Sequence, residues 1–312
     1  HEINKNWKLD ISAYYRLKKL IKKLKPDLVH TWIFAANSYG RYAALNAGVK
    51  KIIAGERCVD PWKRWHEFSI DRFLAKRTNG IVTNSTGVVD FYVGKGIEPG
   101  RFSVIPNGVE RPDLRPVSEM RRVLLDALQL PPETRLIGTV GRLWPQKRTK
   151  DLIWAADLLK CIRDDVHLLI VGDGPMRWRL EKFREQVEIT DRVHFLGDRP
   201  DAQEIISCLD CFWLGSDYEG QSNAVMEAMA RGVPVVATKI PGNADLVIDS
   251  ETGFLVEVGD RAAFAQKTDL LFNDDQLATK MKLSAIERME ADFSIPKMVS
   301  RYVDYYDRVL AE

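Results

Sequence analysis

Residues 216–238 read SDYEGQSNAVMEAMARGVPVVAT, and this stretch predicts a loop, a helix and a buried strand in succession. Ser222 and Asn223 are favourable N-cap residues, and residues 224–231 are rich in strong helix formers. Residues 232–234 (GVP) end the helix, and the VVA that follows is typical of a short buried strand. Such a loop-to-helix junction leaves backbone N–H groups without intrahelical acceptors, so it is a natural anion site.

Two carboxylates, Glu219 and Glu227, flank this helix start. Gly220 allows a tight turn, so we expect Glu219 on the loop and Glu227 one turn into the helix. Either glutamate alone is more often a solvated helix residue or a capping acid. Together, beside an anion site, they suit a phosphorylated polyol whose hydroxyl pairs bind carboxylates.

Short apolar runs alternate with helical patterns along the chain, which predicts a doubly wound α/β fold. The expected strands of a first parallel sheet are residues 27–30, 51–54, 80–83 and 102–105. Those of a second sheet are residues 136–140, 167–171, 193–195, 211–213 and 233–237. The Pro-rich segment 106–116 predicts a domain boundary, and residues 293–310 predict a C-terminal helix that carries Tyr302, Tyr305 and Tyr306.

Composition is that of an ordinary globular protein: 312 residues, 45% hydrophobic and 29% charged, enough for two domains. Four cysteines and the lack of an apolar run near 18 residues favour a reducing, cytoplasmic location without a membrane span. Cys208 and Cys211 form a single CxxC without a second Cys/His pair nearby, so buried thiols are a better interpretation than a zinc site.

Charge is distributed unevenly, because residues 1–110 carry 19 Lys/Arg and 10 Asp/Glu while the remainder is net acidic. Much of the excess falls in residues 14–25 (YYRLKKLIKKLK), a basic amphipathic helix. It would suit an anionic membrane surface, with peripheral attachment, or an outer helix that packs its leucines on a sheet. No nucleic-acid recognition module is present in the sequence.

Doubly wound sheets bind ligands outside the carboxyl ends of their strands. The turns after the expected second-sheet strands therefore share one rim. Gly141 permits close backbone approach there, and Arg142 and Lys147 supply two cations for a diphosphate, with surface salt bridges as the alternative. The turn from Gly172 to Gly174 does not fit GxGxxG, because position 177 is Arg.

The order of these motifs resembles the retaining nucleotide-sugar glycosyltransferases of the GT-B fold, in the family 4 (glycosyl transferases group 1) class. Glu-x7-Glu followed by AMARGVPVVAT carries the resemblance most strongly. Five further segments follow the family's order: residues 102–109 (FSVIPNGV), 139–147 (TVGRLWPQK), 168–175 (LLIVGDGP), 193–197 (VHFLG) and 252–256 (TGFLV).

The resemblance implies two Rossmann-like parallel-sheet domains that face a central cleft. Residues 1–108 would form an acceptor-side domain, joined by the C-terminal helix 296–312, and residues 109–295 a nucleotide-sugar-binding domain. The implied reaction moves a sugar, with retention, from a nucleotide-diphosphate sugar to a glycan or lipid-linked acceptor. No cofactor or metal is expected, because no DxD follows an apolar strand and Arg142 and Lys147 can neutralise the diphosphate.

The resemblance also assigns residues to the donor. Glu227 would hold the ribose hydroxyls, Glu219 the sugar hydroxyls, and the amides from Gly220 to Ala224 the distal phosphate. Glu219, Arg142 and Lys147 are the expected catalytic residues. The expected donor-binding residues are Gly141, Arg142, Lys147, Gly174, Leu196, Gly197, Glu219, Gly220, Gln221, Ser222, Asn223, Ala224 and Glu227.

The acceptor side is less defined. His30 stands where the family often has His-x-His, but Trp32 occupies the second position, so His30 is either catalytic or a core residue of its strand. The family's first strand and Gly-rich loop have no counterpart before Lys25, so we expect the first domain to be incomplete here. A nucleotide-sugar epimerase of similar fold and a non-catalytic nucleotide-sugar-binding protein are the alternative functions.

Overall fold

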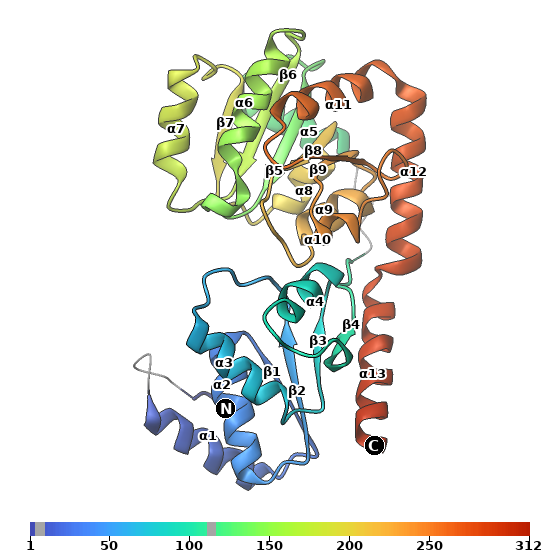
Figure 1. Cartoon of the computed structure of the whole chain (residues 1–312). Helices are drawn as coiled ribbons and strands as arrows, with labels where there is room; N and C mark the ends of the chain where they lie inside the picture. The colour runs from blue at the N-terminus through green and yellow to red at the C-terminus, as the bar shows by residue number, and fades with distance from the viewer. Residues whose placement is uncertain (4–9, 111–116) are drawn as a thin grey trace. The chain divides into compact units, whose positions relative to one another are not determined.

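The chain divides into two compact units, each built around its own parallel sheet (Figure 1). The computed structural model describes residues 1–3, 10–110 and 117–312. Unit 1 comprises His1–Asn107 and Pro296–Glu312, and unit 2 comprises Gly108–Ile295. Every strand pair is parallel, which confirms the doubly wound α/β prediction. Part of the expected boundary segment, residues 111–116, lies outside the described residues.

Unit 1 has a four-stranded sheet in the order β1-β2-β3-β4. Its strands are β1 (Leu28–Trp32), β2 (Lys51–Glu56), β3 (Gly80–Thr83) and β4 (Phe102–Val104). Its helices are α1 (Ile11–Leu24), α2 (Phe34–Ala47), α3 (Trp65–Ala75), α4 (Thr86–Val93), the short η1 (Pro99–Arg101) and α13 (Ile295–Ala311), whose first residue belongs to unit 2.

Alternate residues of β2 separate the two faces of this sheet. Ile52 packs toward α1 and α2, and Ala54 packs toward α3 and α4. Ile53 points to the opposite face, where Tyr305 and Val309 of α13 cover it. The C-terminal helix is thus one of the two layers that bury the sheet of unit 1.

Unit 2 has a six-stranded sheet in the order β10-β9-β8-β5-β6-β7. Its strands are β5 (Arg135–Val140), β6 (Val166–Val171), β7 (Val193–Gly197), β8 (Cys211–Leu214), β9 (Val235–Thr238) and β10 (Phe254–Val256). Its helices are α5 (Val117–Ala127), η2 (Pro145–Lys147), α6 (Thr149–Lys160), α7 (Arg177–Gln186), α8 (Ala202–Ser207), α9 (Asn223–Ala230), α10 (Pro241–Ala244), α11 (Arg261–Asn273) and α12 (Asp275–Asp292).

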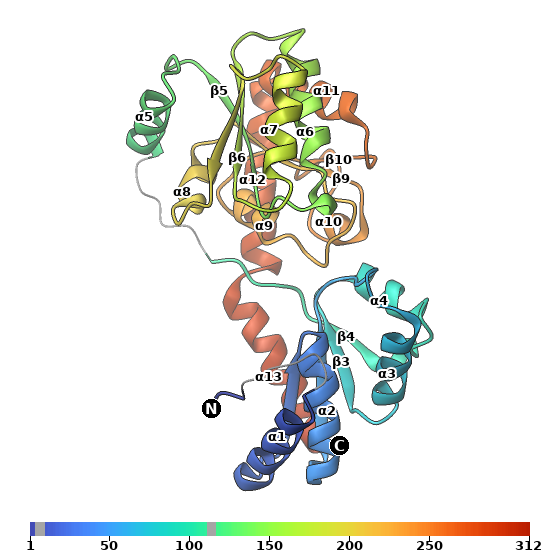
Figure 2. The ribbon, with the colours of Figure 1, turned by 90° about the vertical axis from the view of Figure 1, so that its left-hand side faces the viewer.

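Helices cover both faces of the second sheet (Figures 1 and 2), and a hydrophobic cluster lies on each face. One joins the sheet to α5, α8 and α9, and the other joins it to α6, α7 and α11, while α12 contributes to both. Strand β5 lies between β8 and β6, so successive strands are added outward from β5 first on one side, as β6 and β7, and then on the other, as β8, β9 and β10. This topological switch point is where open parallel sheets bind ligands.

The strand predictions are confirmed, with shifts at the ends that have local causes. Strand β9 begins at Val235, because Pro234 has no N–H to donate to a neighbouring strand. The C-terminal helix begins at Ile295, because Val109 bridges Ser294 just before it. The sequence interpretation did not name β10, a three-residue strand at the edge of the sheet.

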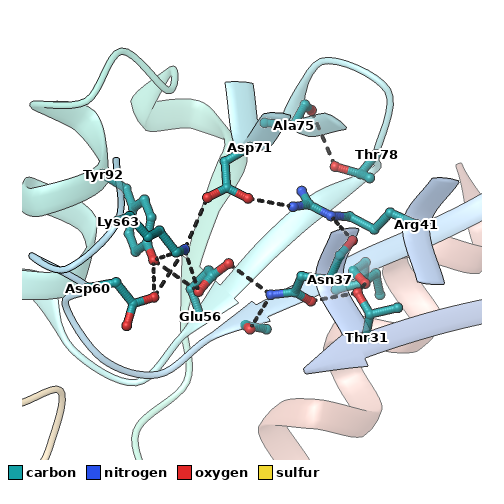
Figure 3. Close-up of polar contacts among 12 residues, drawn as sticks. Thr31, Asn37, Arg41, Glu56, Asp60, Lys63, Asp71, Ala75, Thr78 and Tyr92 are labelled. Atoms are coloured by element: carbon teal, nitrogen blue, oxygen red, sulfur yellow. Dashed lines mark hydrogen bonds and ion pairs between the residues drawn. The ribbon is translucent and has the colours of Figure 1, made fainter. Parts of the chain in front are cut away.

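A network of buried charges connects the loop after β2 to three helices of unit 1 (Figure 3). The ammonium of Lys63 lies 3.0 Å from Asp71, 3.0 Å from Asp60 and 2.7 Å from the hydroxyl of Tyr92. The Lys63 side chain has no exposed surface, and that of Asp71 is 2% exposed. Lys63 therefore fixes its loop against α3 and α4.

The carboxylates in this network extend it to α2. Arg41 donates from Nη2 to Asp71 at 3.0 Å, and Asn37 donates from Nδ2 to Glu56 at 2.8 Å. Burial, followed by the neighbouring Asp71 and Asp60, raises the pKa of Glu56, although Lys63 opposes it. Burial disfavours the charge of Lys63, but the three carboxylates outweigh burial and raise the pKa of Lys63.

Replacing this lysine tests the network. We expect Lys63→Met to lower the free energy of unfolding by about 3–5 kcal/mol, because it leaves buried carboxylates without their cation. Urea titration followed by tryptophan fluorescence measures the change. Lys76→Met, at an exposed position that follows α3, is the matched control and should stay within about 0.5 kcal/mol of wild type. Equal effects of the two variants would contradict the stabilising role of Lys63.

Candidate functional site

The loops that follow β5 and β6 pack directly against one another, backbone to backbone. Gly172 has a φ of +125°, and a Cβ there would overlap the carbonyl oxygen of Gly141. A Cβ on Gly174 would lie 2.7–2.9 Å from backbone atoms of Leu143. The Leu143 amide also donates to the carbonyl of Asp173 at 2.9 Å. Gly172 and Gly174 are therefore needed for the close approach of these two loops, and Gly174 is one of the residues predicted to bind the donor.

A cavity of about 470 Å³ opens at the carboxyl ends of β5, β6 and β7 in unit 2. This volume falls in the usual range for small-molecule sites. The lining residues are Val140, Gly141, Arg142, Trp144, Val171, Gly172, Asp173, Gly174, Asp198, Arg199 and Ala202. Three predicted donor-binding residues, Gly141, Arg142 and Gly174, are among them.

The cations at this cavity differ in how they are held. Arg199 makes a two-pronged ion pair with Asp201, at 2.7 and 2.6 Å, which lowers the pKa of Asp201. Arg142 is exposed, and its guanidinium forms no hydrogen bond or ion pair with the residues that the structure describes. Arg142 is thus available to a bound anion, whereas Arg199 is already neutralised.

The end of β7 is irregular. The register with β6 shifts so that Ile170 pairs with Phe195 and Val171 with Gly197, which leaves Leu196 as the extra residue. Gly197 has a φ of +73°, a conformation that favours glycine. Leu196 packs its side chain against the core beside α5 and α8. Neither residue lines the cavity, so their contacts with the donor stay a prediction.

Side chains from the loops after β5 and β8 meet across the switch point. The Nζ of Lys147 lies 2.5 Å from Oε1 of Glu219, and the Ser216 hydroxyl donates to the same oxygen at 2.7 Å. Gln146 supports this contact, because its side chain donates to the Tyr218 carbonyl at 2.6 Å. The structure thus brings together two of the residues predicted to be catalytic.

Two successive hydrogen bonds connect the Glu219 loop to Thr238 and Asn243. The buried Thr238 donates its hydroxyl to the Ser216 carbonyl at 2.7 Å, and Asn243 donates to the Thr238 carbonyl at 2.8 Å. Gly220 does not have a positive φ, so the turn at this position does not depend on the conformational freedom of glycine. The glycine requirement falls instead on Gly242, where a Cβ would overlap the carbonyl oxygen of Gly220.

Helix α9 begins beside this loop, with Ser222 as its N-cap. The Ser222 hydroxyl accepts the Val225 amide at 3.4 Å, so it satisfies one N–H group of the first turn. Gly220, Gln221 and Ser222 are buried, and Asn223 is exposed. The first turn of α9 therefore begins shortly after Glu219, and the binding of an anion by its N–H groups stays a prediction.

Glu227 lies in α9, one turn beyond the N-cap, and is half-buried. Its Oε1 accepts a hydrogen bond from Nε2 of Gln203 in α8 at 3.2 Å. Burial raises the pKa of Glu227, while Arg231 and Gln203 oppose that rise. Glu227 does not line the cavity and takes no part in the Lys147–Glu219 contact. Its contact is with α8 instead.

Trp144, Asp198, Arg199 and Ala202 line the cavity but were not predicted as site residues. The signal for Trp144 was its place between Arg142 and Lys147, and that for Asp198 and Arg199 was their place directly after β7. Trp144 is 51% exposed, which is unusual for so large an apolar side chain.

His30 packs inside unit 1, on the side of the sheet covered by α13. Its ring stacks on Trp32 at 4.2 Å, and its Nδ1 lies 2.9 Å from the hydroxyl of Tyr306. Burial, and secondarily Arg57, lowers the pKa of His30 to about 4, so the ring is neutral at pH 7. This placement favours the core interpretation of His30.

Cys208 and Cys211 are buried free thiols, and burial raises their pKa values to about 11 and about 12. Within the described residues, no group of three or more His, Cys, Asp or Glu side chains is arranged to hold a metal ion. The helices that the structure describes include none long and apolar enough to cross a membrane.

Known proteins match both units. Residues 121–288 match the family model for glycosyl transferases group 1, and residues 1–111 match that for glycosyltransferase family 4. The Escherichia coli protein named UDP-Gal:alpha-D-GlcNAc-diphosphoundecaprenol alpha-1,3-galactosyltransferase is 30% identical, over 95% of this chain and 79% of its own length. The putative glycosyltransferase EpsD of Bacillus subtilis is 28% identical, over 96% of this chain and 82% of its own.

Solved structures confirm the GT-B fold. Anabaena HepE, crystallised with UDP, has a TM-score of 0.86 at 21% identity, covering 95% of this chain and 82% of its own. Sucrose-phosphate synthase of Thermosynechococcus elongatus has a TM-score of 0.84 at 21% identity, covering 96% and 77%. With the family match spanning more than half of its length, the chain belongs to the glycosyl transferases group 1 family and is a nucleotide-sugar-dependent glycosyltransferase.

Proposed function

We propose that this glycosyltransferase takes a sugar from a uridine-diphosphate sugar and adds it, with retention, to a lipid-linked glycan during assembly of a surface polysaccharide. The observation that carries the donor side is the Lys147–Glu219 contact at the switch point, beside a cavity of suitable volume. The name of the E. coli relative, which specifies a UDP-sugar donor and a diphosphoundecaprenol-linked acceptor, supports the choice of substrates.

The geometry of the Lys147–Glu219 pair suits a donor that carries both phosphate and sugar hydroxyls. An ammonium has three donors, and Glu219 uses one of them. Lys147 and Ser216 both bind Oε1 of Glu219, which leaves Oε2 without a donor among the described residues. In the proposed complex, Lys147 also contacts the diphosphate, and Oε2 of Glu219 accepts from the sugar hydroxyls.

The cations and N–H groups on this rim are suited to stabilising a diphosphate leaving group. The bond from the anomeric carbon to the diphosphate oxygen breaks, and the acceptor oxygen forms the new bond to that carbon. The acceptor proton passes to the leaving phosphate. Arg142, Lys147 and the first-turn amides of α9 stabilise the charge that develops on the leaving group, and no divalent metal is required.

Product analysis tests the reaction. The protein is incubated with uridine, guanosine, adenosine and thymidine diphosphate sugars and a sugar-diphosphoundecaprenol acceptor. We expect UDP to be released together with an acceptor one sugar longer, and NMR coupling constants to show that the donor's anomeric configuration is retained. Inversion, exclusive use of a non-uridine donor, or an altered sugar that stays on its nucleotide would each contradict the proposal.

Substitutions test the donor site. We expect Arg142→Ala and Lys147→Ala each to lower kcat/KM for the donor about 100-fold or more, because each removes a charge that stabilises the leaving diphosphate. The control is Lys150→Ala, which replaces an exposed lysine at the second position of α6 and should keep wild-type kinetics. The site assignment is wrong if Arg142→Ala and Lys147→Ala match that control.

We further propose that α1 holds unit 1 on an anionic membrane surface, where a lipid-linked acceptor resides. Tyr14, Leu17 and Ile21 of this helix pack against the core near α2. The opposite side carries the exposed Lys19, Lys22 and Lys23, together with the exposed apolar residues Ile11 and Tyr15. Packing on the sheet thus leaves a separate cationic face, with apolar groups at its N-terminal end, that suits anionic headgroups.

Vesicle sedimentation tests this surface. We expect the protein to bind vesicles of phosphatidylglycerol and phosphatidylcholine, and the bound fraction to fall as salt rises, because screening weakens the attraction. Replacing Lys19, Lys22 and Lys23 by Gln should lower binding by about 100-fold, since each basic residue contributes about 1 kcal/mol. The matched control replaces three exposed lysines of unit 2 (Lys150, Lys280 and Lys282) by Gln. Equal losses in the two triple variants would contradict the role of α1.

A further inference from the structure

Glu227 belongs to a closed ring of hydrogen bonds that also includes Gln203 and Arg231. Gln203 donates from Nε2 to Oε1 of Glu227 at 3.2 Å, and its own Oε1 accepts from Nη2 of Arg231 at 3.0 Å. Arg231 completes the ring, because its Nη1 donates to the main-chain carbonyl of Glu227 at 3.2 Å. The ring thus joins α8 to the C-terminal half of α9 through two contacts between side chains and one contact to the main chain.

We propose that Gln203 and Arg231 are positioning residues that hold the Glu227 carboxylate ready for the paired ribose hydroxyls of the nucleotide. This inference rests on the proposed donor site. Neither residue contacts the nucleotide in this arrangement, and both act through Glu227. We refer to the two residues as the Glu227 clamp.

Geometry explains why the clamp is needed. A glutamate side chain has three rotatable bonds, and ordering a free one on binding costs conformational entropy. The hydrogen bond from Gln203 engages Oε1 only, so Oε2 and the remaining lone pair of Oε1 stay available as acceptors. Arg231 lies one helical turn beyond Glu227 and orients the amide of Gln203, which has no other recorded partner among the described side chains.

The clamp also favours the ionised carboxylate, which is the form that accepts two hydroxyl groups. Burial raises the pKa of Glu227, and Arg231 and Gln203 lower it. Burial lowers the pKa of Arg231, and Glu227, Glu204 and Glu110 oppose that effect. Removing Arg231 or Gln203 leaves burial less opposed, so the pKa of Glu227 rises. Protonation of Glu227, and with it the loss of donor affinity, then begins at a higher pH.

Kinetics and titrations across pH test the clamp. We expect Gln203→Leu and Arg231→Met each to raise KM for the UDP-sugar about tenfold, the equivalent of one hydrogen bond to a charged group, with kcat nearly unchanged. The affinity for UDP, measured by calorimetry from pH 5 to pH 8, should begin to fall at a higher pH in both variants. Arg231→Lys should restore the pH profile of wild type, because it keeps the charge, but not the whole of the KM.

Two controls separate this inference from the donor site on which it rests. Gln276→Leu replaces an exposed glutamine of α12 and should leave KM and the pH profile at wild-type values. Glu227→Gln keeps the size of the side chain and removes its charge. It should therefore raise KM and abolish the fall of UDP affinity at acidic pH. If Glu227→Gln has these effects while Gln203→Leu and Arg231→Met match Gln276→Leu, the clamp is refuted and the donor site stands. If Glu227→Gln itself changes nothing, the ribose role fails and the clamp fails with it.

Discussion

The contact between Lys147 and Glu219 joins two loops that are 72 residues apart in sequence, and the arrangement of the donor side depends on it. The strand order explains this contact. Strands β5 and β8 are parallel neighbours, so the loops that follow them leave the same edge of the sheet. The neighbouring loops after β5 and β6 are joined differently, through backbone contact at Gly172 and Gly174. The same rim therefore has two loops packed backbone to backbone and an ion pair whose two side chains can also bind a ligand.

Sequence patterns predicted the two sheets well because buried parallel strands carry a strong signal. The runs at β3 and β6 are mostly apolar and buried on both faces, and turn residues bound them. Edges carry a weaker signal. Strand β10 has three residues and pairs on one side only, so neither its length nor its alternation marks it in the sequence. The C-terminal helix begins at Ile295, inside the segment 293–310 that was expected to hold it, because the bridge from Val109 to Ser294 comes just before it.

The candidate site was also predicted only in part from the sequence. Motif spacing placed Gly141, Arg142, Lys147 and Glu219 on one rim, because the carboxyl ends of parallel strands share an edge. It could not show that Lys147 and Glu219 touch, since that depends on side-chain direction and on Gln146 and Ser216 beneath them. The glycine that makes the tightest contact with the Glu219 loop was not predicted, for a related reason. The tight approach involves Gly242, which comes from a different loop and has no periodic signature.

Three glutamates near the ends of strands or the start of a helix show how environment separates structure from binding. Glu56 accepts from Asn37 through one oxygen and faces Tyr92 and Lys63 through the other, so its acceptor capacity is used within unit 1. Glu219 and Glu227 each engage recorded partners through Oε1 alone. A buried carboxylate that is satisfied on both oxygens stabilises a fold, because breaking any bond leaves an unpaired charge. A half-satisfied carboxylate on a rim keeps an acceptor for hydroxyl groups, and its existing partner fixes the direction in which that acceptor points. Spare hydrogen-bonding capacity, rather than residue type or pKa direction, is what distinguishes the two kinds of glutamate in this protein.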